Sequence, residues 1–301
     1  MPIRIPRLAA ATALLLALLL PASTLLAQTS IDERHPLASG GRVEVENVAG
    51  SIRVSGWDRD EVTVTGSLGE GQRLEVDASR NRVRIKVIYP RNSRGGRGAQ
   101  LELRVPKGAE LQASAVSADV DVTGVDLRRL QAKSVSGGVN VAGRTGEADL
   151  GSVSGAIRGR IATPRLEAGT VSGRIEIDGG VSGDVRLESV SGAISLTAAK
   201  IEQLRGESVS GGMTVRAGAL APGGRIVLES VSGSIGLQLP ADASAQLRVS
   251  SFSGNITSDA GEVERPRYGP GRSLDTRLGG GDGDVSIKSH SGSVRVDIGG
   301  R

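Results

Sequence analysis

Apolar and polar residues alternate along most of this chain, and the alternation recurs with a period of about 19 residues. Each repeat carries the tetrad Ser-Val-Ser-Gly or a near variant of it. The last residue of the tetrad stands at Ala118, Gly137, Gly155, Gly173, Gly192, Gly211, Gly233, Gly254 and Gly292. Successive tetrads lie 18 to 22 residues apart, and the final interval of 38 residues equals two periods. Self-similarity of this kind predicts a repeat architecture.

When the repeats are aligned on the last tetrad residue, apolar residues fill fixed columns on both sides of it. The column two residues after it holds Val120, Val139, Ile157, Ile175, Ile194, Met213, Ile235, Ile256 and Val294. The column seven residues before it holds Leu130, Ala148, Leu166, Val185, Leu204, Ile226, Leu247 and Val285. This period-two alternation predicts two short strands per repeat, each with one buried face.

A third column, three residues before the end of the tetrad, is always hydroxylic. Its members are Ser134, Ser152, Thr170, Ser189, Ser208, Ser230, Ser251 and Ser289. The column shares the parity of the apolar columns, so we expect a buried ladder that hydrogen-bonds to neighbouring backbone. The alternative is an exposed row of hydroxyls that binds a ligand. The parity of the alternation reverses across Val-Ser-Gly, which predicts a corner there, and we expect its glycine to supply an unusual φ.

One repeat of this length cannot bury its own apolar row, but stacked repeats can. The sequence therefore predicts an all-β fold, a single-stranded β-solenoid with coils of about 19 residues and two to three short strands per coil. Stacked coils would lie about 4.8 Å apart. The pattern does not fix the handedness of the solenoid.

The first residues are expected to be a targeting segment and not part of the fold. Arg4 and Arg7 precede the apolar run Leu8 to Leu20, and Pro21 ends that run. The run is shorter than the roughly 20 residues that span a bilayer. We therefore expect a signal peptide over 1–27, cleaved after Ala27, rather than a retained membrane anchor, and a periplasmic or extracellular location for the mature chain.

The remaining chain divides into segments of different regularity. Residues 28–40 are polar and are expected to form a flexible tether. Residues 41–110 read as less regular strands that form the first coils and an N-terminal cap, and 111–301 as the regular repeats. Two stretches rich in Gly and Arg are expected to be loops, at 90–99 and in an insertion at about 261–283.

Composition supports a thin stacked core. The chain holds 44 Gly but only one Trp, two Tyr and one Phe, and it has no Cys. The cross-section of one coil is expected to be too thin for large rings, whereas Val, Ile, Leu and Ala stack well in columns. The absence of Cys excludes disulfides and a lipid-anchored form. Loss of Arg4 and Arg7 with the leader lowers the formal charge from +4 to +2, a mixed surface that does not favour nucleic acid as a partner.

The sequence offers no catalytic set. His35 lies in the expected tether, and His290 stands at a corner where most repeats have Val. No residue pair stands out as nucleophile and base among many equivalent serines. We therefore expect no enzyme activity, no cofactor and no metal site.

Binding residues, if any, are expected among the rare rings and the two Arg-rich loops. Per-repeat insertions often carry binding in solenoids. The candidates are Trp57, Tyr89, Arg91, Arg94, Arg97, Arg265, Arg267, Tyr268 and Arg272.

Several motifs together resemble a known family. They are Val48 to Val54, Gly56 to Val62, Leu103 to Ala109, the Ser-Val-Ser-Gly repeats, and Gly279 to Val296. Together they cover about 41–301 and resemble the bacterial β-strand-repeat putative adhesin family, a domain of unknown function. The resemblance implies an exported β-solenoid and carries over no functional residue.

The leading hypothesis is thus an exported, non-enzymatic β-solenoid that serves as an adhesin or a structural or binding scaffold of the bacterial cell envelope. One alternative is an accessory role in envelope-stress signalling, and a less favoured one is a polysaccharide-acting β-helix enzyme. The partner stays open among an envelope component, a polysaccharide and a protein, and the oligomeric state is also open.

Overall fold

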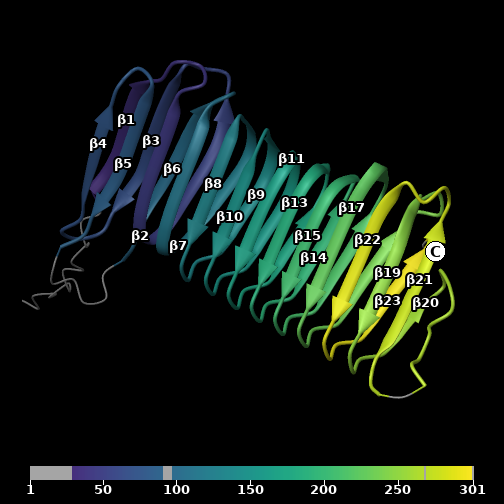
Figure 1. Cartoon of the computed structure of the whole chain (residues 1–301). Coiled ribbons are helices and arrows are strands. Elements are labelled where there is room, and N and C mark those ends of the chain that lie inside the picture. Colours follow the sequence, from purple (N-terminus) through teal and green to yellow (C-terminus); the bar gives the residue numbers. More distant parts are fainter. Residues whose placement is uncertain (1–28, 91–96, 268, 300–301) are drawn as a thin grey trace, which may run out of the picture.

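A computed structural model of the chain describes residues 29–90, 97–267 and 269–299. The predicted signal peptide therefore lies outside the described residues. The described residues form 23 strands and no helix, stacked into one elongated body (Figure 1). The prediction of an all-β solenoid is correct.

The strands follow the chain in this order: β1 (Thr29–Pro36), β2 (Arg42–Trp57), β3 (Glu61–Leu68), β4 (Arg73–Ala78), β5 (Arg82–Ile88), β6 (Ala99–Pro106), β7 (Glu110–Leu127), β8 (Arg129–Ser134), β9 (Val139–Thr145), β10 (Ala148–Ser152), β11 (Ile157–Thr170), β12 (Ile175–Asp178), β13 (Val181–Ser189), β14 (Ile194–Ala198), β15 (Lys200–Ser208), β16 (Met213–Ala217), β17 (Leu220–Ser230), β18 (Ile235–Leu239), β19 (Ala245–Ser251), β20 (Ile256–Ser258), β21 (Arg272–Leu278), β22 (Gly283–Ser289) and β23 (Val294–Ile298).

Two parallel ladders run the length of the stack and enclose the core between them. The first ladder has the spatial order β4-β5-β2-β7-β8-β10-β11-β13-β15-β17-β22-β19-β21. The second has the order β1-β3-β6-β2-β7-β9-β11-β12-β14-β16-β18-β23-β20. Pairing turns antiparallel only at the ends, at β4, β21, β3 and β1.

Coils at both ends of the stack lie out of sequence order. At the N-terminal end, β2 lies between the β5–β6 coil and β7, although β5 and β6 follow it in the chain. At the C-terminal end, β22 and β23 lie between the β17–β18 coil and the β19–β20 coil (Figure 1). The expectation that the final interval holds two ordinary periods is therefore wrong, because the last coil folds back into the stack.

The predicted apolar columns form the core. Val120, Val139, Ile157 and Ile175 are fully buried and stand opposite one another on successive coils. Each column stacks on itself at the spacing of adjacent strands, about 4.8 Å. Aliphatic side chains suit this arrangement, which explains how a chain with so few aromatic residues buries a continuous core.

The hydroxyl column is buried as predicted, and its members bond to backbone except Ser230, whose Oγ has no partner among the described residues. The Ser134 hydroxyl donates to the carbonyl of Ala118 on the preceding coil at 3.0 Å and accepts from the Gly137 N–H at 3.0 Å. Serines of later coils hold the same corner through contacts such as Ser189 Oγ to the Gly192 carbonyl at 2.8 Å. The first kind of bond joins a corner to the preceding coil, and the second closes the corner on itself.

The corner glycines are required for a different reason from the one predicted. None of the regular tetrad glycines has a positive φ. A Cβ on Gly137 would instead lie 2.0 Å from the Ala118 carbonyl oxygen, and one on Gly155 would lie 2.0 Å from the Gly137 carbonyl oxygen. Close stacking of successive corners, not an unusual φ, selects glycine there.

Two segments are more ordered than the sequence predicts. The expected tether contains β1, which pairs with β3 over the whole of Thr29–Pro36. The insertion expected to be a loop contains β21, which pairs antiparallel with β19. Antiparallel strands thus cover exposed ladder edges at both ends of the stack, as an open solenoid requires.

Candidate binding surface

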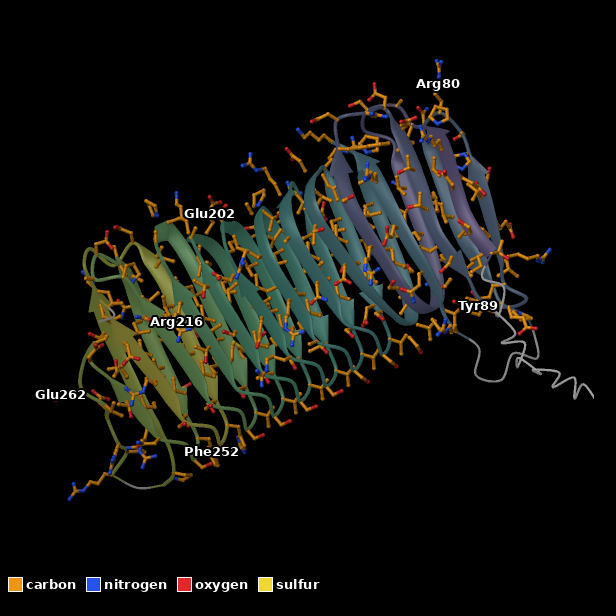
Figure 2. All side chains as sticks on the ribbon, turned by 180° about the vertical axis from the view of Figure 1, so that it is seen from behind. Arg80, Tyr89, Glu202, Arg216, Phe252 and Glu262 are labelled. Carbon is orange, nitrogen blue, oxygen red and sulfur yellow. The ribbon has the colours of Figure 1, made fainter. Side chains whose placement is uncertain are left out.

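A row of apolar side chains is exposed along one long edge of the stack. Its members are Val48, Val116, Val135, Val153, Val171, Val190, Val209, Val231 and Phe252, each between 43% and 53% exposed. We call this row the valine ridge. His290 takes the place between Val231 and Phe252, because β22 lies between β17 and β19. Figure 2 shows Tyr89 and Phe252 near opposite ends of this edge.

The tetrad produces this edge directly. Its first Ser points into the core and its Gly touches the preceding corner, so the Val between them must point outward. The next Ser is also exposed and fixes the corner. Ser191 Oγ donates to the Val171 carbonyl at 3.2 Å, and Ser210 Oγ donates to the Val190 carbonyl at 3.2 Å. Bonds of this kind join each corner from Ser172 onward to an adjacent coil.

A groove of about 1610 Å³ runs beside the ridge on the outer face of the first ladder. The ridge forms one wall. Side chains two and four residues before the ridge form the other, and they are Lys133, Asp149, Glu167, Glu188, Glu207, Glu229 and Lys288. Gly151 and Gly169 stand in that wall without side chains. The groove is thus apolar on one side and mainly acidic on the other.

Most of the acidic side chains in the groove are paired within the chain. Lys133 Nζ lies 2.8 Å from Asp149, Arg186 Nε lies 2.9 Å from Glu188, and Lys288 Nζ lies 3.6 Å from Glu229. Arg205 pairs with Glu207, and the hydrogen bond to that carboxylate raises the pKa of the Arg205 guanidinium. The charged wall therefore presents both signs at close spacing.

The C-terminal end of the groove is lined by the insertion. Phe252 and His290 stack there with ring centroids 4.9 Å apart and an interplanar angle of 4°. Arg265 and Arg272 come from the insertion and line the same end. Arg272 Nη1 donates to the Gly254 carbonyl at 2.5 Å, and its buried Nε has no hydrogen-bond partner among the described residues.

Two of the predicted candidates thus lie in the groove, Arg265 and Arg272. Arg267 lies near them and is exposed. Arg97 lies at the other end of the molecule, where its carbonyl accepts a hydrogen bond from Gln72. Arg91, Arg94 and Tyr268 lie outside the described residues.

The two remaining candidates hold the N-terminal coils together. Trp57 Nε1 donates to the Glu61 carbonyl at 2.8 Å, and the guanidinium carbons of Arg59 and Arg104 lie 5.2 and 5.8 Å from its ring centroid. The Tyr89 hydroxyl donates to Asn47 Oδ1 at 2.6 Å and accepts from the Ala49 N–H at 3.1 Å. Both rings therefore have structural contacts of their own.

The described part of the chain contains no group of three or more His, Cys, Asp or Glu residues arranged to hold a metal ion. No helix among the described residues is long and apolar enough to cross a membrane.

Sequence reasoning did not identify the valine ridge. The available signal was parity, because the Val of each tetrad stands one residue after an inward Ser and so belongs to the outward set. An apolar residue repeated at an outward position is the pattern of a binding edge.

The fold and the exposed ridge define a stacked-β repeat protein with an extended apolar edge. Residues 42–297 match the Toastrack DUF4097 family, and the chain belongs to that family. A search of curated proteins finds no significant match.

Two solved structures are similar to this chain. One is titled a putative cell adhesion protein from Clostridium sporogenes, with 7% identity, a TM-score of 0.22, and coverage of 90% of this chain and 100% of that one. The other is titled a putative adhesin from Bacteroides fragilis, with 10% identity, a TM-score of 0.37, and coverage of 90% of this chain and 98% of that one.

Proposed function

We propose that this protein is an exported, non-enzymatic binding scaffold of the bacterial cell envelope that acts as an adhesin, and that the valine ridge with its groove is the binding surface. The ridge is the observation that supports this function. Soluble monomers rarely expose contiguous apolar patches beyond a few hundred Å², and larger ones mark interaction sites. Here the apolar side chains follow one edge along almost the whole stack.

The form of the surface favours a long partner over a small molecule. At about 4.8 Å per coil, the ridge extends for roughly 45 Å. The groove beside it is continuous from Ser114 to Ser289. A partner that lies along the edge would contact many coils at once, and each coil would add a similar small contribution.

Export rests on the leader sequence. The charged start, the short apolar run and the break at Pro21 are typical of a cleaved signal peptide. Cell fractionation of the full chain, followed by N-terminal sequencing, should find the protein in the periplasm or medium with Gln28 as its first residue. Uncleaved protein in the cytoplasm would contradict export.

Binding is tested with the purified chain from residue 28 on and isolated envelope fractions. The ridge variant Val171→Ser/Val190→Ser should lose most of the binding. A matched control, Thr197→Ser/Thr214→Ser, changes the outer face of the second ladder and should bind like the wild type. Equal binding by all three proteins, or turnover of an envelope polysaccharide, would overturn the proposed function.

A further inference from the structure

We infer that the partner of the valine ridge is a second copy of this chain, docked antiparallel along the same edge. This inference rests on the proposed function and names the occupant of the same surface, so that the envelope partner is itself a copy of this chain. It rests on how charge is arranged on the two rows of side chains next to the ridge. We call these the inner row, two residues before each ridge position, and the outer row, four residues before it.

Both rows change sign near the middle of the stack. From the N-terminal side, the outer row contains Asp149 and Glu167 and then Arg186 and Arg205 on successive coils. The inner row changes in the opposite sense, with members Lys133, Gly151, Gly169, Glu188, Glu207 and Glu229. The outer row is therefore antisymmetric in charge about the boundary between the coils of Glu167 and Arg186, and Lys133 and Glu229 of the inner row follow the same symmetry.

Such a face is complementary to itself under one symmetry operation. The operation is a two-fold axis that runs parallel to the strands and passes through that boundary. It reverses the order of the coils in the second copy and keeps each row opposite the same row. Glu167 then faces the second copy's Arg186, and Asp149 faces its Arg205. In the inner row, Lys133 faces Glu229. Because the interface is two-fold, every such pair occurs twice.

The sizes of the facing residues are also complementary along the inner row. Under the same operation, the side chains of Glu188 and Glu207 face Gly169 and Gly151 of the second copy. Gly169 leaves open space in the wall of the groove, since no atom lies within 4 Å of where its Cβ would be, and Glu188 is long enough to enter it. The Lys133 side chain lies over Gly151, so Glu207 meets a cation there. The apolar ridges meet each other beside these rows, so Val171 faces Val190 across the axis.

The charges also select one register out of many. A repeating ridge alone could slide by whole coils at little cost. If the second copy slides by one coil in one direction, Glu167 faces Glu167 of that copy. A slide in the other direction brings Arg186 against Arg186 and Lys133 against Lys288. Like charges in direct contact cost several kcal/mol in an interface, so only the register centred between Glu167 and Arg186 pairs opposite charges throughout.

Within the monomer, Arg186 and Arg205 pair with Glu188 and Glu207 along each strand, but adjacent strands still set like charges side by side. Glu188, Glu207 and Glu229 stand opposite one another on adjacent strands, as do Arg186 and Arg205. Like charges directly opposite in a sheet are destabilising. A second copy sets opposite charge over Arg186, Arg205 and Glu229, gives Glu188 the open space at Gly169, and brings Glu207 to the Lys133 side chain that lies over Gly151. The ridge and two rows over ten coils offer about 30 positions, which matches the roughly 20–30 residues a side of a standard interface.

Sedimentation velocity with charge-reversed variants tests the inference. The wild-type chain from residue 28 on should be a dimer at micromolar concentration. Glu167→Arg and Arg186→Glu should each weaken dimerisation at least tenfold. An equimolar mixture of the two variants should dimerise again, because in the mixed pair each new charge faces its opposite. The double variant Glu167→Arg/Arg186→Glu should also dimerise.

Two controls separate this inference from a folding defect and from the proposed function. Glu176→Arg reverses a charge on the same coil but on the other ladder, and it should leave the dimer unchanged. Wild-type protein that is monomeric at 100 µM, or single variants whose mixture stays monomeric, would overturn the inference. If such a monomer still loses envelope binding on Val171→Ser/Val190→Ser, the proposed function stands and only its partner is wrong.

Discussion

Phe252 and His290 stack face to face with ring centroids 4.9 Å apart, although 38 positions separate them in the chain. They meet because the last coil, β22 and β23, lies between the β17–β18 coil and the β19–β20 coil. The chain therefore forms the outermost coil, β19 and β20, and the antiparallel strand β21 before the final coil. The final coil then lies between the outermost coil and the β17–β18 coil.

Removal of the final coil should release the C-terminal end of the stack. A chain that ends at residue 283 lacks β22 and β23, the parallel neighbours of β19 and β20. We expect residues 245–283 to become sensitive to protease, while the stack up to β18 stays protected. Limited proteolysis with mass spectrometry identifies the resistant fragment.

A chain that ends at residue 244 is the matched control for this truncation. Both truncated chains should yield the same resistant core, which ends near β18. If residues 245–283 stay protected in the longer one, β19 pairs directly with β17 and the inserted coil is not needed to hold the end of the stack.

The corner glycines should tolerate no side chain, and their neighbours should tolerate one. Gly137→Ala places a methyl group 2.0 Å from the Ala118 carbonyl oxygen, whereas a Cβ on Gly138 would meet its nearest atom at 3.6 Å. We expect the first substitution to cost about 2–3 kcal/mol, the upper range for overpacking. Gly138→Ala should have little effect. Chemical denaturation of the two variants measures the difference, and equal stabilities would contradict close stacking as the reason for glycine.

The buried hydroxyl of each corner should contribute to stability, unlike the exposed one. Ser134→Ala removes a hydrogen bond to the Ala118 carbonyl and leaves the buried Gly137 N–H without its acceptor. A buried polar group left unpaired costs about 1–3 kcal/mol. Ser136→Ala, on the exposed side of the same corner, should change the unfolding free energy by less than about 0.5 kcal/mol. A reversed order of the two effects would refute the role of the inner column.

Stability at the N-terminal end should fall in acid. Glu110 is mostly buried, and Arg42 Nη2 and Arg128 Nη2 lie 2.9 and 2.6 Å from its carboxylate. The hydrogen bond from Arg42, with the charge of Arg128, lowers the pKa of Glu110 in the folded chain. A lowered pKa stabilises the folded state above the unfolded value of about 4.3, and this contribution is lost as pH falls through the folded pKa.

The variant Glu110→Gln isolates this contribution. Its unfolding free energy should be lower than that of the wild type at pH 7, and the difference should shrink between pH 5 and pH 3. Thermal unfolding across this pH range measures both. A difference that does not depend on pH would show that the Glu110 carboxylate is not the group responsible.

The local alternation of apolar and polar residues was sufficient to predict the fold. The column that begins at Val120 and the one that begins at Leu130 are buried as expected, because period-two alternation depends only on neighbours along one strand. The partners of the strands at the two ends of the stack could not be predicted from the sequence. Nothing in the residues around β22 distinguishes a coil stacked on β19 from one inserted between β17 and β19, since every coil carries the same columns.

Only part of the proposed binding surface could be predicted from the sequence. Arg265 and Arg272 were found because they stand in an insertion, and they line the end of the groove. Trp57 and Tyr89 were chosen for their rarity, yet their polar atoms are bonded to nearby backbone. The charge reversal between Glu167 and Arg186 was accessible from the sequence, because the coils from Asp149 to Arg205 stack in chain order.

The central claim is that the valine ridge binds a partner in a fixed register, and engineered cysteines test it most directly. The chain has no native cysteine, so each introduced thiol is unique. A mixture of Val171→Cys and Val190→Cys chains should form a disulfide-linked heterodimer rapidly under mild oxidation, because these positions face each other across the axis. Val171→Cys alone should cross-link far more slowly. Equal rates for the mixture and the single variants, or no cross-linked species at all, would contradict the account.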